Sequence, residues 1–96
     1  MLSDIPKKLE KLNKEDIDKE ILRAGIIAEL DAINLYEQMA AMTENGDIKK
    51  ILLDIAKEEK THTGEFQHLL LKIDQEQVNE MKAGKEEVEK ELAKEK

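Results

Sequence analysis

Apolar residues recur along two stretches of the chain at intervals of three and four, which is the period of an α-helix that buries one face. The first stretch carries Leu22, Ile26, Ile33 and Tyr36 in this register. The second carries Ile48, Leu52, Ile55, Phe66, Leu69 and Ile73. The remaining positions are mostly Glu, Lys, Ala and Leu, which favour helices. The pattern therefore predicts an all-α fold with two long helices, over residues 16–43 and 48–73.

A short polar segment separates the two stretches. Asn45 and Gly46 suit a helix stop, and Asp47 suits the N-cap of the next helix. Two helices of similar length joined by one tight turn form an antiparallel αα-hairpin. We therefore expect the centre of the chain to be a helical hairpin.

The C-terminal part is more polar. Asp74 offers a third N-cap, so a shorter helix is expected over residues 75–82, with Gly84 interrupting it. Residues 85–96 are expected to be either a solvated charged helix or a frayed tail. At 96 residues the chain forms one small domain. We divide it into a lead-in (1–15), a helical hairpin (16–73), and a C-terminal helix with a charged tail (74–96).

Each apolar stripe contains residues that are usually solvated. Glu29 lies at the centre of the first stripe. Glu59 and His62 fill, in register, the gap between Ile55 and Phe66 in the second. All three side chains therefore lie on the apolar faces of their helices. An unpaired buried carboxylate is unfavourable by several kcal/mol, so these residues require a compensating partner.

A divalent metal would be a suitable partner, because iron, manganese and zinc accept carboxylate oxygen and imidazole nitrogen. Di-iron sites in four-helix bundles use one Glu from each of two helices and a Glu-x-x-His from each of the other two. One chain supplies half of this set, as Glu29, Glu59 and His62. Two copies about a two-fold axis would supply all of it. The same dimer would complete a four-helix bundle and cover both stripes.

Other residues near this set allow two interpretations. Glu65 and His68 repeat the Glu-x-x-His spacing on a polar face, which favours a solvated surface pair. Asp31, Glu58 and Glu65 form either an acidic approach for cations, as secondary metal sites, or an ordinary solvated face. Tyr36 is expected in the core, with its hydroxyl directed towards the site.

Composition excludes several classes of protein. The chain has no cysteine, which excludes disulfide scaffolds, cysteine-based zinc sites and iron–sulfur clusters, and fits a cytoplasmic protein. Its net charge is −7, with 16 basic and 23 acidic residues and only two aromatic ones. Such a chain neither neutralises phosphates nor stacks bases, so no nucleic-acid partner is expected. No apolar run approaches the ~20 residues of a membrane helix, and no membrane partner or signal peptide is expected.

Two segments resemble the encapsulated ferritins, which are short two-helix relatives of ferritin and rubrerythrin. The segments are IAELDAINLYEQ (27–38) and ILLDIAKEEKTH (51–62), within a resemblance that covers residues 21–73. The resemblance implies a ferroxidase that oxidises Fe(II) to Fe(III) with O2 at a di-iron centre between two chains. The family's ligands fall on Glu29, Glu59 and His62, and its central tyrosine falls on Tyr36.

The resemblance also implies an assembly. Members of the family form rings, commonly decamers of five dimers, inside an encapsulin nanocompartment that stores the iron mineral. Their cargo proteins usually end in an apolar targeting peptide or are fused to the shell. This sequence ends in Glu-Leu-Ala-Lys-Glu-Lys, so either a longer chain was trimmed or encapsulation does not apply. The rival hypotheses are a non-enzymatic helical oligomerisation module with polar register residues, and a rubrerythrin-like peroxidase, which the absence of cysteine disfavours.

Overall fold

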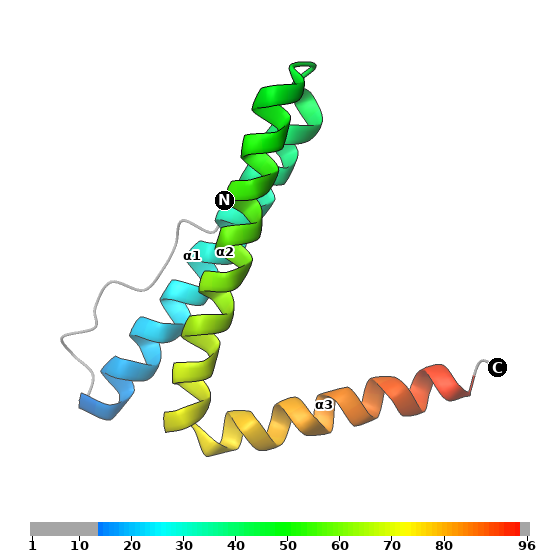
Figure 1. The fold of residues 1–96 in the computed structure, drawn as a ribbon. Coiled ribbons are helices and arrows are strands. Elements are labelled where there is room, and N and C mark those ends of the chain that lie inside the picture. Colours follow the sequence, from blue (N-terminus) through cyan, green and yellow to red (C-terminus); the bar gives the residue numbers. More distant parts are fainter. Residues whose placement is uncertain (1–13, 95–96) are drawn as a thin grey trace.

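The computed structural model describes residues 14–94, and all three of its elements are helices. These are α1 (Lys14–Met42), α2 (Gly46–Ile73) and α3 (Gln75–Ala93) (Figure 1). The described residues contain no strand, so the all-α prediction is confirmed. Of the lead-in expected over residues 1–15, residues 1–13 lie outside the described part of the chain, and residues 14 and 15 already belong to α1. No helix in that part combines the length and the hydropathy needed to cross a membrane.

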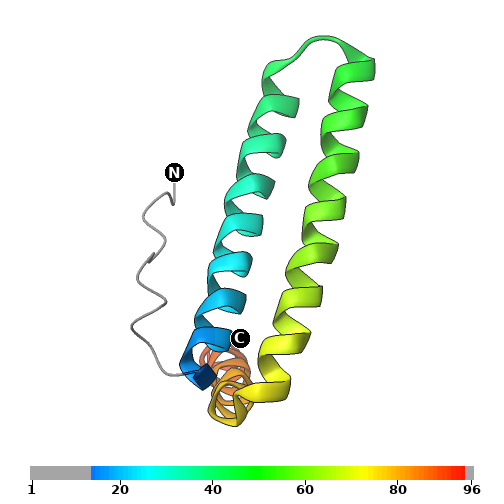
Figure 2. The same cartoon turned by 90° about the vertical axis from the view of Figure 1, so that its left-hand side faces the viewer.

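α1 and α2 run antiparallel and side by side along their whole length (Figure 2), which is the predicted hairpin. The two helices bury few side chains between them. Among the described residues the buried apolar ones are Ile33, Ala40, Ala56 and Leu70. Three of the large aliphatic side chains on the hairpin, Ile48, Ile51 and Leu69, are about half exposed. The hairpin therefore has a thin core and an apolar surface that it cannot cover by itself.

The turn between α1 and α2 is capped by Asn45 and not, as predicted, by Asp47. The Asn45 side-chain oxygen accepts hydrogen bonds from the backbone N–H groups of Asp47 (2.9 Å) and Ile48 (3.1 Å). Its own N–H donates to the Thr43 hydroxyl at 3.1 Å. Asn45 has the extended backbone that an N-cap requires, so α2 begins at Gly46, and Asp47 lies in its first turn. A carboxylate in that turn stabilises the helix, because it interacts favourably with the positive end of the helix dipole.

Asp74 forms the corner between α2 and α3 and is the predicted N-cap of α3. Its carboxylate accepts a hydrogen bond from the backbone N–H of Gln77 at 3.0 Å. It also accepts one from Arg23 Nη2, on α1, at 3.0 Å. The Gln77 N–H, followed by the charges of Lys19 and Arg23, outweighs desolvation and lowers the pKa of Asp74. The Asp74 carboxylate thus links the start of α3 to α1 of the hairpin.

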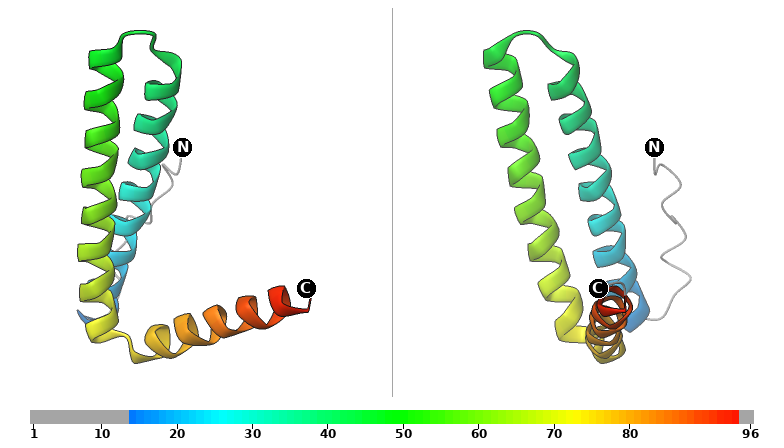
Figure 3. Two further views of the ribbon diagram at one scale, coloured as in Figure 1. Left: turned by 45° about the vertical axis from the view of Figure 1, so that its right-hand side comes forward. Right: turned by 90° about the vertical axis from the view of Figure 1, so that its right-hand side faces the viewer.

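α3 stands away from the hairpin and gives the molecule an L shape (Figure 3). The break predicted at Gly84 is wrong, because α3 continues through this glycine to Ala93. A single glycine lowers helix stability by about 1 kcal/mol relative to alanine, and the strong helix formers on both sides outweigh it. Of the two forms expected for the C-terminal residues, the structure shows a solvated helix, with Val88 and Leu92 exposed.

Candidate metal centre

The three polar residues of the apolar stripes meet at one point between α1 and α2. Glu29 lies near the middle of α1, and Glu59 and His62 lie one turn apart on α2. His62 Nδ1 lies 3.6 Å from Glu29 Oε2 and 3.6 Å from Glu59 Oε2. One ligand atom from each residue lies within 4.8 Å of the other two. The antiparallel pairing of the helices therefore converts two sequence spacings into a single group, which we call the Glu29–Glu59–His62 cluster.

The interior of this cluster is acidic and short of hydrogen-bond donors. The side chains of Glu29 and Glu59 are each 19% exposed, whereas the His62 imidazole is 45% exposed and lies at the rim. Glu29 Oε2 is buried and has no hydrogen-bond partner. The His62 nitrogen, at 3.6 Å, is too far away for a hydrogen bond. Leaving a buried acceptor unpaired is unfavourable by about 1–3 kcal/mol, and by more if it is charged.

Lys60 and Arg23, two basic residues of the hairpin, pair with carboxylates outside the cluster. Lys60, which follows Glu59, forms an ion pair with Glu37 across the hairpin at 2.9 Å. Arg23, on α1, bonds Asp74 at 3.0 Å. Within the described part of the chain, the ion pairs of the two cluster carboxylates are those with His62. In residues 14–94, no lysine or arginine ion pair therefore compensates the charge of the two cluster carboxylates.

The geometry and donor types of the cluster fit a divalent metal ion. At a metal–ligand distance of about 2.1 Å, adjacent ligands of an octahedral centre lie about 3.0 Å apart and opposite ligands about 4.2 Å apart. The three donor atoms lie within 4.8 Å of one another, so small side-chain rotations would bring them to these separations. A cation would also neutralise the carboxylates and give Glu29 Oε2 a partner. The unpaired oxygen is thus the feature of the structure that fits a metal best.

The structure does not bring the other sequence candidates into the cluster. Tyr36 is partly buried, but it lies seven residues beyond Glu29, which is about 10 Å along α1. Asp31 is partly buried, and Glu58 and Glu65 are exposed. Among the residues described, no other set of three carboxylate or histidine side chains lies within 4.8 Å. His68 is exposed together with Glu65, in line with a solvated pair.

A contact one turn from the cluster was not anticipated. Gly25 on α1 lies against the ring of Phe66 on α2, and a Cβ atom at residue 25 would come within 3.2–3.3 Å of three ring atoms. Gly25 precedes Glu29 by four residues, and Phe66 follows His62 by four. The sequence feature that indicates this contact is a glycine within a strongly helical segment, where glycine is otherwise unfavourable.

An antiparallel helical hairpin with a glutamate on one helix and a Glu-x-x-His on the other is one half of a ferritin-like carboxylate bundle. The fold and the cluster therefore define a ferritin-like hairpin. The model of the Rubrerythrin family matches residues 20–95, and the chain belongs to this family.

Individual relatives agree with this assignment. The crystal structure of an encapsulated ferritin domain from Pyrococcus furiosus is 56% identical and superimposes with a TM-score of 0.75, covering 94% of this chain and 86% of that one. A ferritin-like–encapsulin shell fusion protein of P. furiosus is 64% identical over 75 residues, which is 78% of this chain and 21% of the relative. The encapsulin nanocompartment cargo protein EncC of Myxococcus xanthus is 45% identical over 56 residues, or 58% and 43% of the two chains. The chain thus spans less than half the length of either full-length relative.

Proposed function

We propose that this chain is a ferroxidase that oxidises Fe(II) with O2 at a di-iron site formed between two copies of the hairpin. The observation that carries the proposal is the buried Glu29 Oε2, which has no hydrogen-bond partner and lies 3.6 Å from His62 Nδ1. An oxygen in this state is unfavourable in the metal-free protein, and a bound cation would remove the penalty. Fe(II) is the substrate in this proposal, and the Fe(III) product is cargo for storage.

Charge and electron balance both favour two ions between two chains. One cluster carries two carboxylates, so the four carboxylates of a symmetric dimer balance two Fe(II) ions. Two Fe(II) ions supply the two electrons that reduce O2 to hydrogen peroxide, with two protons taken from solvent. Glu29 and Glu59 would hold the ions close together, and the imidazole of His62 would bind as a neutral ligand. The chain's own role is to bind and orient the ions, while Tyr36, about 10 Å along α1 from Glu29, is not a ligand in this proposal.

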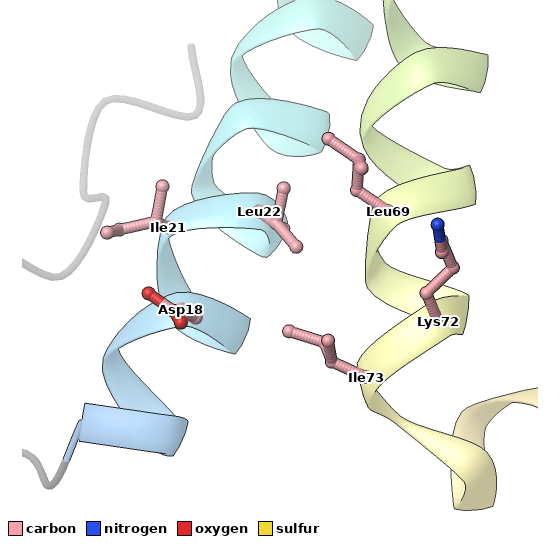
Figure 4. A pocket seen from close by; sticks show the side chains of 6 residues that line it. All are labelled: Asp18, Ile21, Leu22, Leu69, Lys72 and Ile73. Carbon is pink, nitrogen blue, oxygen red and sulfur yellow. The ribbon is translucent and has the colours of Figure 1, made fainter.

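The apolar surface of the hairpin supports pairing with a second copy. Leu69 and Ile73 follow His62 at spacings of seven and eleven, so they share its side of α2. Together with Ile21 and Leu22 of α1 they line a groove of about 340 Å³, and Asp18 and Lys72 complete its lining (Figure 4). Leu69, Ile73 and Ile21 are about half exposed there. A partner hairpin packed on this face would cover the groove and bring a second cluster to the first.

The larger assembly is also part of the proposal. Two relatives are named as an encapsulin fusion protein and an encapsulin cargo protein, which supports an encapsulin shell as partner and an encapsulin compartment as location. We propose that dimers assemble into a ring, as the resemblance to encapsulated ferritins implies, with a decamer as the expected size.

The enzymatic proposal is tested by removing the cluster residues one at a time. Glu29→Ala, Glu59→Ala and His62→Ala each delete two ligands from a symmetric site. Oxidation of Fe(II) in air, followed by absorbance, should fall towards the rate of free Fe(II), while circular dichroism remains helical. The matched controls are Glu65→Ala and His68→Ala, which have the same residue types and spacing but are exposed.

The controls should oxidise iron like the wild type. Equal losses of iron oxidation in both sets would mean that Glu59 and His62 are the wrong Glu-x-x-His pair. Wild-type rates in every variant would leave the non-enzymatic oligomerisation module as the better interpretation, because that module needs the apolar face but not the ligands.

Assembly is tested by native mass spectrometry without oxygen. Gathering four carboxylates at one interface is repulsive, and binding two Fe(II) ions removes this repulsion. Fe(II) should therefore shift the mass towards dimers and rings, and a strong chelator should shift it back. Identical masses in both conditions would mean that apolar packing alone holds the copies together.

A further inference from the structure

The contact between Gly25 and Phe66 lies in the layer of the hairpin next to the Glu29–Glu59–His62 cluster. Gly25 is one helical turn from Glu29 on α1, and Phe66 is one turn from His62 on α2. A Cβ atom at residue 25 would lie 3.2 Å from Phe66 Cδ2 and Cε2 and 3.3 Å from Cζ. Ordinary van der Waals contacts of a Cβ atom begin at 3.4 Å. The ring therefore occupies space that exists because residue 25 has no side chain.

We propose that Gly25 and Phe66 are positioning residues for the cluster. With glycine at this point, the bulky ring fits between the helices without forcing them apart, and the helix separation that results sets how far Glu29 lies from Glu59 and His62. This inference rests on the proposed function, and it adds the element that fixes the geometry of that site. Neither residue offers a metal ligand, so both act through the helices that carry the ligands.

A side chain at residue 25 would displace the ring or the helix by an amount comparable to the tolerance of a metal site. Alanine at residue 25 would force the ring or the helix to move by a few tenths of an ångström. Metal–ligand distances tolerate deviations of only about 0.2 Å. A displacement of this size, one turn from two ligands, is therefore as large as the tolerance of the site. Residues that support ligands in other metalloproteins typically change metal affinity about 10–100-fold when they are replaced.

Phe66 also separates the cluster from the apolar groove. Leu22 and Leu69, which line the groove, lie three residues beyond Gly25 and Phe66 towards the open end of the hairpin. The ring thus lies between the groove and the ligands. Held against Gly25, it presents an apolar wall to the carboxylates on that side, and this wall strengthens their attraction for a cation by excluding water.

The test uses Co(II), which binds nitrogen and oxygen ligands, is not oxidised by air at such a site, and reports its coordination geometry by visible absorption. Gly25→Ala should bind Co(II) about tenfold more weakly than the wild type and show a changed spectrum. Gly64→Ala and Gly84→Ala are matched controls, since both sites are helical and a Cβ atom there meets nothing within 4 Å. Both controls should keep the wild-type affinity and spectrum while they melt at a higher temperature.

A second variant separates positioning from a general loss of stability. Phe66→Leu shortens the side chain that faces residue 25, so a methyl group there no longer collides with it. Gly25→Ala should therefore change Co(II) affinity by less than twofold in the Phe66→Leu background. This comparison also tests the positioning role if Gly25→Ala alone does not fold. An equal loss in both backgrounds, or wild-type Co(II) binding by Gly25→Ala, would overturn the inference. Absence of Co(II) binding by the wild type would instead overturn the proposed metal site itself.

Discussion

Replacing Glu29 with leucine should stabilise the metal-free protein. The substitution removes a carboxylate whose Oε2 is buried without a hydrogen-bond partner and fills the same space with an apolar side chain. Relief of one unpaired buried acceptor is worth about 1–3 kcal/mol. In a domain of this size 1 kcal/mol shifts Tm by about 4–8 °C, so we expect Tm to rise by at least about 4 °C. Glu65→Leu, at an exposed site, should stay within about 0.5 kcal/mol of the wild type.

The order should reverse when metal is added. At a free Co(II) concentration of 1,000 times the wild-type Kd, binding to the folded state adds about 4.1 kcal/mol, which exceeds the gain from leucine. The variant lacks a ligand, so it should gain much less. The assay is thermal unfolding by circular dichroism at one protein concentration, with chelator and with Co(II). The reasoning is refuted if Glu29→Leu lowers the Tm of the metal-free protein, or if Co(II) raises both melting temperatures equally.

Three further substitutions test the helix caps and the ion pair that hold the helices around the cluster. Asn45→Ala should destabilise the protein by about 1 kcal/mol, measured by urea unfolding, because α2 loses both hydrogen bonds to the capping side chain. Asn45→Asp should not destabilise it, because aspartate also caps helices. Lys60→Ala should change stability by less than about 1 kcal/mol, since this lysine and Glu37 are 59% and 46% exposed, and 1 M salt should abolish the difference. Asp74→Asn retains the cap but loses the charge. Because the folded pKa of Asp74 is lowered, the ionised carboxylate stabilises the protein above about pH 4 and ceases to do so as the pH falls through the folded pKa. The Tm of the wild type should therefore fall more steeply than that of the variant between pH 4 and pH 2, and parallel curves would contradict this assignment.

The helices and the cluster could be predicted because helical periodicity converts spacing into geometry. Once Glu29, Glu59 and His62 fall in register with apolar residues, an antiparallel hairpin leaves little freedom in where they meet. The sequence determines the capping residue of a helix less well than it determines the helix itself. Asn45 and Asp47 both suit an N-cap, and the choice depends on which residue leaves the helical conformation; Asn45 does so, at φ −84° and ψ 117°.

Gly84 and Gly25 show a second limit of sequence analysis. Both are single glycines among strong helix formers, and the sequence does not show which of them receives a side chain from a neighbouring helix. In the structure Gly84 faces open space and α3 continues through it, whereas Gly25 receives the ring of Phe66. Only the register between α1 and α2 distinguishes the two cases, and that register depends on how the helices pack.

The position of His62 connects the cluster to assembly. The two carboxylates lie inside the hairpin, but the imidazole is 45% exposed at the rim, on the side of α2 that also carries Leu69 and Ile73. A metal ion held by these three residues would therefore have open coordination positions towards solvent, in the direction from which a second hairpin would approach. With only four buried apolar side chains among the described residues, a single hairpin has little to offset the entropy of ordering its backbone, at about 1 kcal/mol or more per residue. The partner would thus supply both the missing core and the missing ligands, so folding, assembly and metal binding should all depend on protein concentration and be weakened together by a chelator.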